Sequence, residues 1–231
     1  MMLTYPLLLD HIQDGTPFAF TRWGDGEILA VLGDASPNCD GHHRRPDLQE
    51  ALKKVLEEQN EHQTMYMGLQ SLGDNRYPDF KRMYPNIQWS NADIIHIMNM
   101  QGGWWLFAQE INKCPNICLI SNHHKVSPHV PENCELKYHR HIPVPEKDCW
   151  EWPVNWENIG NLNLFCASMA ANVWISWLWK SDPSATYIDL GSAYDPYTGI
   201  ISRRYHHAIL DHYKVPADQR TYAGSQRNFK P

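Results

Sequence analysis

The segment Arg22-Trp-Gly-Asp-Gly-Glu27 places two acids two residues apart, across Gly26, at the end of an apolar, strand-like run. Carboxylate oxygens bind hard divalent cations, and Mg²⁺ is commonly held by one or two carboxylates together with substrate phosphate oxygens. We therefore expect Asp25 and Glu27 to bind a metal ion, with Arg22 neutralising a phosphate beside it. Gly24 and Gly26 would form the loop against that ligand. The same spacing also fits a turn in which Glu27 completes a helix N-terminus and Arg22 pairs with an acid.

A second acidic segment spans residues 187–196 and reads as a buried strand that ends in Gly191 and Ser192. Ligands of open α/β sheets bind at the carboxyl ends of strands, so we expect these two residues to contact a ligand. Asp189 lies inside the strand, where a carboxylate is costly unless it is paired. It has either a structural partner or a role in the site. Asp195 is a further site candidate, although it also fits a turn before Pro196.

Two other loops follow predicted strands. The segment 162–166 passes into a predicted helix over 172–179, so Ser168 and the N–H groups after it are candidates to bind a phosphate at a helix N-terminus. An ordinary N-cap serine is the alternative. His123 and His124 follow the predicted strand 116–121, where a surface loop is the simpler interpretation.

Apolar runs bounded by turn residues alternate with segments of helical period along the chain, which is typical of an α/β layer architecture. We predict a mostly parallel sheet flanked by helices. The predicted strands lie near residues 18–23, 64–68, 116–121, 136–142, 162–166 and 186–190, and the clearest helices at 46–61 and 198–213.

Length and composition indicate one globular domain over residues 1–231, because 231 residues with 42% hydrophobic and 20% charged residues are ordinary for such a chain. The net charge of −6 gives no support for a broad nucleic-acid-binding surface. The longest apolar stretch, 162–179, contains asparagines and serines, so we expect no membrane span. The polar segment 219–231 would be a flexible tail or would order on a substrate.

The six cysteines are scattered without a Cys-x-x-Cys pair, and two of them lie in apolar, strand-like runs. The first ten residues have no basic flank before their apolar patch and no small-residue cleavage site after it. Both observations favour a reduced, cytoplasmic protein.

Three blocks resemble the GT-D class of metal-dependent glycosyltransferases, a family first described as a bacterial domain of unknown function. They are Arg22–Glu27, which is similar to that family's metal motif, a proline-led block Val144–Trp150, and Ile188–Pro196, which is similar to its closing motif. Their order is the family's order. The sequence departs from the pattern at Asp148 and Cys149, where the family would have Asn and Ala.

The resemblance implies a Rossmann-like fold, a nucleotide-diphosphate sugar as donor, and Mn²⁺ or Mg²⁺ held near Asp25 and Glu27. The reaction would transfer the sugar to an acceptor such as a glycan, a glycoprotein or a hydroxymethylated base of modified DNA. If the anomeric centre inverts, a base must take the acceptor's proton, and Asp195 and Asp189 are the candidates. A non-catalytic nucleotide-sugar or glycan-binding protein and a metal-dependent phosphohydrolase are the alternatives. The oligomeric state stays open.

Overall fold

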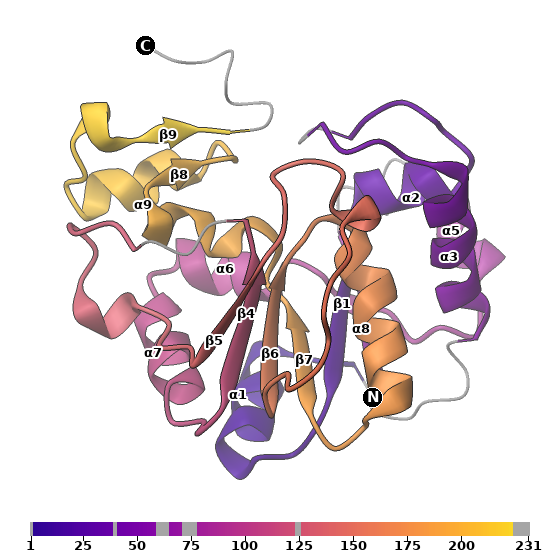
Figure 1. Ribbon diagram of the computed structural model, residues 1–231, viewed down its shortest axis with the longest axis horizontal. Helices are drawn as coiled ribbons and strands as arrows, with labels where there is room; N and C mark the ends of the chain where they lie inside the picture. Colours follow the sequence, from indigo (N-terminus) through magenta and orange to yellow (C-terminus); the bar gives the residue numbers. More distant parts are fainter. Residues whose placement is uncertain (1, 39–40, 59–64, 71–77, 123–125, 224–231) are drawn as a thin grey trace.

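Parallel strands form the central layer of the protein (Figure 1). The computed structural model describes residues 2–38, 41–58, 65–70, 78–122 and 126–223, and within them it has one sheet of seven strands in the order β3-β2-β1-β7-β6-β4-β5. Every pairing in this sheet is parallel. The strands are β1 (Ala19–Trp23), β2 (Met65–Leu69), β3 (Ser90–Asn91), β4 (Ile117–Ser121), β5 (Arg140–Pro143), β6 (Leu162–Cys166) and β7 (Thr186–Asp189).

The inner strands are buried on both faces, which explains their nearly continuous apolar sequences. In β4 every residue is buried, and β2 shows the same pattern. These two strands therefore show no alternation of exposed and buried residues. The predicted fold class, a single α/β domain with a Rossmann-like parallel sheet, is confirmed.

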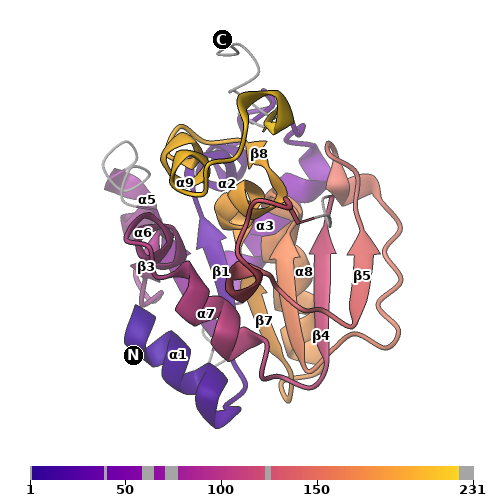
Figure 2. The same cartoon turned by 90° about the vertical axis from the view of Figure 1, so that its left-hand side faces the viewer.

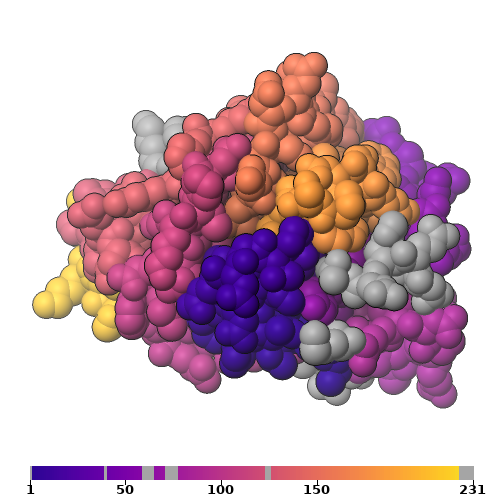
Figure 3. All heavy atoms as spheres, turned by 90° about the horizontal axis from the view of Figure 1, so that it is seen from below, coloured from indigo at the N-terminus to yellow at the C-terminus, as the bar shows by residue number. Residues whose placement is uncertain are grey.

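Helices cover both faces of the sheet and divide the core in two. Residues of α1, α6 and α7 join one hydrophobic cluster, and residues of α2, α3, α5 and α8 join the other. Figure 2 shows the first group together on one side of the strands. Figure 3, seen from below, shows α1 in indigo on that face of the molecule. The helices are α1 (Tyr5–Asp14), α2 (Asp25–Val31), α3 (Pro46–Glu57), α5 (Pro78–Met83), α6 (Ile94–Met100), α7 (Trp104–Ile111) and α8 (Met169–Ser181).

Local sequence signals explain where the clearest helices begin and end. Helix α1 starts after Thr4, whose hydroxyl accepts a hydrogen bond from the N–H of Leu7, and it stops at Gly15 in the left-handed conformation. Helix α3 begins with Pro46 as its first residue, and the part of the predicted helix beyond residue 58 lies outside the described residues.

The prediction of one helix over 198–213 was wrong. Gly199 adopts the left-handed conformation with φ = 78° and ends a turn of 3₁₀ helix, Asp195–Thr198. The next residues form a two-residue strand, β8 (Ile200–Ile201), which pairs with β9 (Thr221–Tyr222). Only α9 (His206–His212) is helical in the remainder. The buried isoleucines that suggested helical spacing are therefore buried by strand pairing and by α9.

Two other predicted boundaries need correction. In the predicted strand 136–142 only β5 pairs with the sheet, because the N–H of Lys137 donates to the side chain of Asn112 at 2.7 Å instead of to a strand. The predicted tail 219–231 begins in a 3₁₀ turn and continues into β9, and residues 224–231 lie outside the described part of the chain. Within the residues that the structure describes, no helix combines the length and the apolar composition needed to cross a membrane.

Candidate functional site

A cavity of about 520 Å³ opens where the strands end. Residues that directly follow β1, β2, β3 and β4 contribute to its wall, together with residues just beyond β6 and β7. This is the edge at which ligands of open α/β sheets bind. All ten residues predicted for the site line this one cavity: Arg22, Gly24, Asp25, Gly26, Glu27, Ser168, Asp189, Gly191, Ser192 and Asp195.

The two acids of the first motif open helix α2. Asp25 is the first residue of the helix, and one carboxylate oxygen of Glu27, Oε2, accepts a hydrogen bond of 2.9 Å from the N–H of Gly24. Glu27 therefore completes the helix N-terminus, as the alternative interpretation of the motif required. This bond uses Oε2, so the helix cap and a contact with a cation through Oε1 are compatible. A Cβ atom at position 24 would lie 2.9 Å from the side-chain oxygen of Gln70, another residue of the cavity wall.

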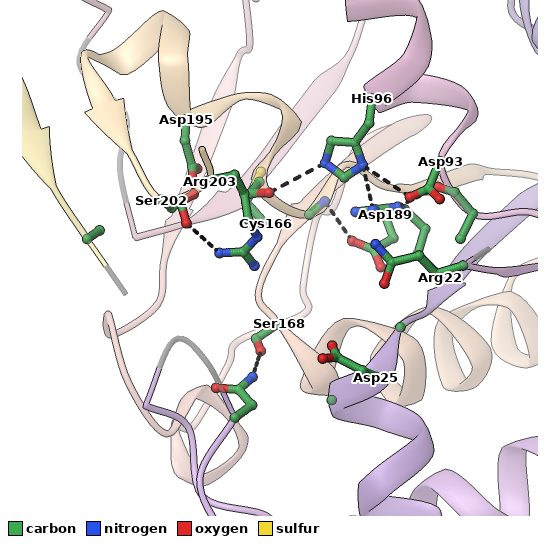
Figure 4. A pocket seen from close by; sticks show the side chains of 18 of the residues that line it. Arg22, Asp25, Asp93, His96, Cys166, Ser168, Asp189, Asp195, Ser202 and Arg203 are labelled. Atoms are coloured by element: carbon green, nitrogen blue, oxygen red, sulfur yellow. Dashed lines mark hydrogen bonds and ion pairs between the residues drawn. The ribbon is translucent and has the colours of Figure 1, made fainter. Parts of the chain in front are cut away.

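Arg22 lies in β1, and its side chain bonds to three residues from distant parts of the chain. Its Nε donates to the carbonyl oxygen of Ala92 at 2.8 Å, and its Nη1 donates to that of Leu190 at 3.3 Å. Its Nη2 lies 2.7 Å from Nδ1 of His96. Figure 4 shows the guanidinium beside Asp189 and His96 at one side of the cavity. The arginine is thus a fixed cation rather than a mobile surface charge.

Gly191 is required by this arrangement for two reasons. Its φ of 53° lies in the left-handed region, which disfavours other residues. A Cβ atom at position 191 would also overlap Nη1 of Arg22 and would lie 3.2 Å from its Cζ. The first and last motifs therefore meet in space, and the glycine of one leaves room for the arginine of the other.

Two of the carboxyl groups in the cavity have raised pKa values. Burial raises the pKa of Asp189 to about 6, although Arg22 and the N–H of Gly191, which donates to Asp189 at 2.8 Å, both oppose the shift. Burial also raises the pKa of Glu27 to about 7, and the negative charge of Asp189 adds to this effect while Arg22 again opposes it. The two acids are close enough to repel each other, so a cation between them would be stabilised.

Asp195 lies on another side of the cavity, in the 3₁₀ turn that follows the closing motif. Its carboxylate accepts a hydrogen bond from the hydroxyl of Ser202. Figure 4 groups these two residues with Arg203, whose guanidinium donates to the carbonyl oxygen of Ser202 at 2.9 Å. Asp195 is therefore an oriented carboxylate at the cavity wall, and it lies nearer to the surface than Asp189.

Ser168 precedes α8 with φ = 51°, and its side chain makes no cap bond to the helix. Its hydroxyl instead accepts a hydrogen bond of 2.9 Å from the side-chain amide of Asn38. Ser168 is therefore the N-cap residue of α8 by position, but its side chain does not cap the helix. Ser168 and Asn38 line the cavity together.

The central block contributes through a loop contact. The N–H of Asp148 donates to Nδ1 of His42 at 2.9 Å, and the Asp148 carboxylate accepts the N–H of His43 at 2.8 Å. The hydrogen bond from the His43 N–H is the largest of the effects that lower the pKa of Asp148. Glu146 and His42 line the cavity. At position 148, where the sequence departs from the pattern of the GT-D class, the backbone N–H bonds to His42 and the side chain bonds to His43.

Several lining residues were not predicted. Gln70 and Asn122 each directly follow a parallel strand, a signal that would have found both. His96 and Arg203 have no such signal, because they lie beyond the two-residue strands β3 and β8. His123 and His124 lie outside the described residues.

The acids of the cavity fit a Mg²⁺ or Mn²⁺ ion that takes part of its coordination from a ligand. Among the residues that the structure describes, no three His, Cys, Asp or Glu side chains are grouped to hold a metal ion by themselves. Magnesium sites of phosphate-binding enzymes need only one or two carboxylates, with waters and phosphate oxygens completing the shell. Asp25, Glu27 and Asp189 supply oxygens of the right kind, and the repulsion between the last two is relieved by a cation.

Comparison with solved structures gives two matches, and both are structures of one domain. Two structures are similar over 84% of this chain and 79% of theirs, each with a TM-score of 0.61 and 14% sequence identity. One is a selenomethionine-substituted structure of domain of unknown function 1792 (DUF1792). The other is described with the words that this highly conserved domain "has a distinct glycosyltransferase fold". No protein-family model and no curated protein matches the sequence. At this identity the likeness concerns the fold, so the chain has the fold reported for DUF1792.

Proposed function

We propose that the protein is a metal-dependent glycosyltransferase of the GT-D class, which moves a sugar from a nucleotide-diphosphate sugar to a hydroxyl acceptor. The fold it shares with DUF1792, reported as a distinct glycosyltransferase fold, supports this proposal. Fold alone does not establish activity. Activity depends on the residues that line the cavity.

One observation carries it: the first and last sequence motifs interlock at Arg22, which bonds to Leu190 168 positions further along, in a cavity that also holds Asp25, Glu27 and Asp189. A fixed guanidinium beside acids suited to a divalent cation is a matched arrangement for a diphosphate. The guanidinium binds phosphate oxygens directly, and the acids bind them through the cation. A bare anion-binding site would not need the acids, and a bare metal site would not need the arginine.

When bound, Mg²⁺ or Mn²⁺ would neutralise charge on the departing diphosphate. Asp25 and Glu27 would hold the ion. Arg22 would contact the diphosphate. Gly24 and Gly26 have no side chains, so the phosphates could approach the backbone at the start of α2. On the remaining wall, Ser168, Gly191 and Ser192 would contact the donor.

The transfer step also needs a group that takes the proton of the acceptor hydroxyl. Asp195 is the stronger candidate, because its carboxylate is oriented by Ser202 on the side of the cavity away from Arg22. Asp189 is the weaker one, because it is buried at 4% exposure and lies beside the arginine. Its position suits charge balance around Arg22 better than contact with an acceptor.

The test is a panel of nucleotide sugars incubated with the protein, with and without Mn²⁺, and read out by release of nucleoside diphosphate. Glu27→Gln serves as the matched variant, because it removes the charge and keeps the size. Metal-dependent release that requires an added acceptor supports the proposal. Release with free sugar as the only product would identify a hydrolase. Donor binding without release under any condition would identify a binding protein.

A further inference from the structure

His96 has a hydrogen-bonding geometry that fixes its protonation. Its Nδ1 lies 2.7 Å from Nη2 of Arg22. Arginine has only donors, so Nδ1 must accept this hydrogen bond and cannot carry a proton. The proton of the imidazole is then on Nε2, which lies 3.4 Å from the hydroxyl of Ser192. The imidazole is therefore neutral and links Arg22 to the closing motif.

The groups around His96 all favour this neutral form except Asp93. The nearest oxygen of Asp93 is 3.9 Å from Nδ1, which is beyond hydrogen-bonding distance. Arg22, Arg203 and His206 face the ring with positive or potentially positive charge, and the ring of Tyr205 packs edge-on at 5.5 Å. Burial is the largest cause, followed by the charge of Arg22, and together they hold the pKa of His96 well below its usual range.

The partners of Arg22 share a property that matters for an incoming anion. Its side chain donates to two main-chain carbonyls and to one neutral imidazole, and within the described residues no ion pair to a carboxylate is found at this guanidinium. Arg22 already interacts electrostatically with the carboxylates of Asp189 and Glu27. A carboxylate in the place of His96 would orient the arginine but would add a further negative charge beside it. A neutral acceptor orients the guanidinium without that added charge, which is the arrangement expected of a preorganised electrostatic site.

We propose that His96 is a positioning residue that accepts a hydrogen bond from Arg22 as the Nε2–H tautomer and so holds the guanidinium charge toward the diphosphate of the donor. The diphosphate part of this inference rests on the proposed function. The pairing of His96 with Arg22 does not.

Two variants of His96 separate the acceptor from the bulk of the ring. His96→Ala removes the acceptor, whereas His96→Asn returns an oxygen close to the position of Nδ1. His11→Ala is the control, because His11 makes a side-chain bond of 2.9 Å to the hydroxyl of Tyr66 but does not line the cavity. The probe is the set of uridine, guanosine, adenosine, cytidine and thymidine diphosphates with Mn²⁺, titrated by calorimetry.

We expect the Kd of the best diphosphate to rise about tenfold in His96→Ala, the scale of one hydrogen bond to a charged group, and to stay within about threefold of wild type in His96→Asn and His11→Ala. Unchanged binding in His96→Ala would overturn the proposal while the proposed function stood. Equal weakening in His96→Ala and His96→Asn, with both folded, would also overturn it, since the acceptor would then be irrelevant.

Nitrogen-15 NMR of the wild-type imidazole tests the pairing without a ligand. We expect Nδ1 of His96 to stay unprotonated and Nε2 protonated as the pH is lowered through the usual histidine pKa of about 6.5. A proton on Nδ1, or titration near the usual value, would overturn the proposal. If the expected tautomer is found but no diphosphate binds the wild type, the proposed function fails and the pairing with Arg22 remains.

Discussion

Replacing Gly191 by alanine tests whether the first and last motifs meet at Arg22. At φ = 53° a residue with a Cβ costs about 1–2 kcal/mol. The new Cβ would overlap Nη1 of Arg22, so the guanidinium would have to move and would lose its 3.3 Å bond to Leu190. Loss of one hydrogen bond from a charged group adds about 1.5–3 kcal/mol. The expected loss of unfolding free energy is therefore about 2.5–5 kcal/mol in total.

Gly15→Ala is the matched control for this change. Gly15 has φ = 64° at the end of α1, and a Cβ there would meet nothing within 4 Å. It should therefore show the backbone cost alone, about 1–2 kcal/mol. With about 2–4 °C per kcal/mol for a domain of this size, we expect the melting temperature to fall by about 10 °C in Gly191→Ala and about 4 °C in Gly15→Ala.

Ligand binding separates the two variants further. Displacement of Arg22 should weaken binding of a nucleoside diphosphate with Mn²⁺ by at least about tenfold in Gly191→Ala, which corresponds to about 1.4 kcal/mol. Gly15→Ala should bind as the wild type does. If Gly191→Ala has the same melting temperature as Gly15→Ala and binds the diphosphate with wild-type affinity, the interlocking of the two motifs is refuted. If the wild type binds no diphosphate, the difference between the melting temperatures of the two variants still tests whether the motifs interlock.

Five other outcomes are expected. Asp25→Asn and Glu27→Gln should each abolish metal-dependent binding of a nucleoside diphosphate in calorimetry and leave the fold intact, because each removes a charge without changing the volume. The affinity for Mn²⁺ with diphosphate should rise between about pH 5 and pH 8, since the metal binds the ionised forms and the pKa values of Glu27 and Asp189 are raised to about 7 and about 6. The same raised pKa values mean that ionisation of these acids destabilises the fold as the pH rises, so Glu27→Gln should melt no lower than wild type at pH 8. Asp189→Asn should lower the melting temperature more than Asp195→Asn, and Asp195→Asn should lower the initial rate of transfer more. Thiol counting under denaturing conditions should find six free cysteines; a disulfide would contradict the expected reduced compartment.

The sequence predicted the cavity residues well because they lie in short motifs directly after strands. Parallel strands end at one edge of the sheet, so residues such as Asp25 and Gly191 come together whatever the loops between them do. The sheet itself was predictable for a similar reason, since buried strands such as β4 and β6 are continuous apolar runs. Local order along the chain was sufficient for these features.

The remaining features depend on contacts that no local pattern encodes. Strand β3 has two residues, too few for a periodic signal, and so the approach of Ala92 and His96 to Arg22 was not foreseen. Ile200 and Ile201 have helical spacing with later residues but pair with β9, because burial by a neighbouring strand outweighs a weak helical preference. In both cases tertiary pairing decides the structure.

Strand β7 has a consequence for how the protein is made. It lies between β1 and β6, and without it the strands β3-β2-β1 and β6-β4-β5 share no partner. Until residues 186–189 are available, a chain emerging from the ribosome has no strand to join these two groups, and the edges of β1 and β6 lack their common partner. Unpaired edges of this kind invite misassociation with other chains. Because Arg22 and Asp189 come together only when β7 is inserted, a ligand of the cavity would find its site only after β7, the last strand of the seven-stranded sheet, has been made.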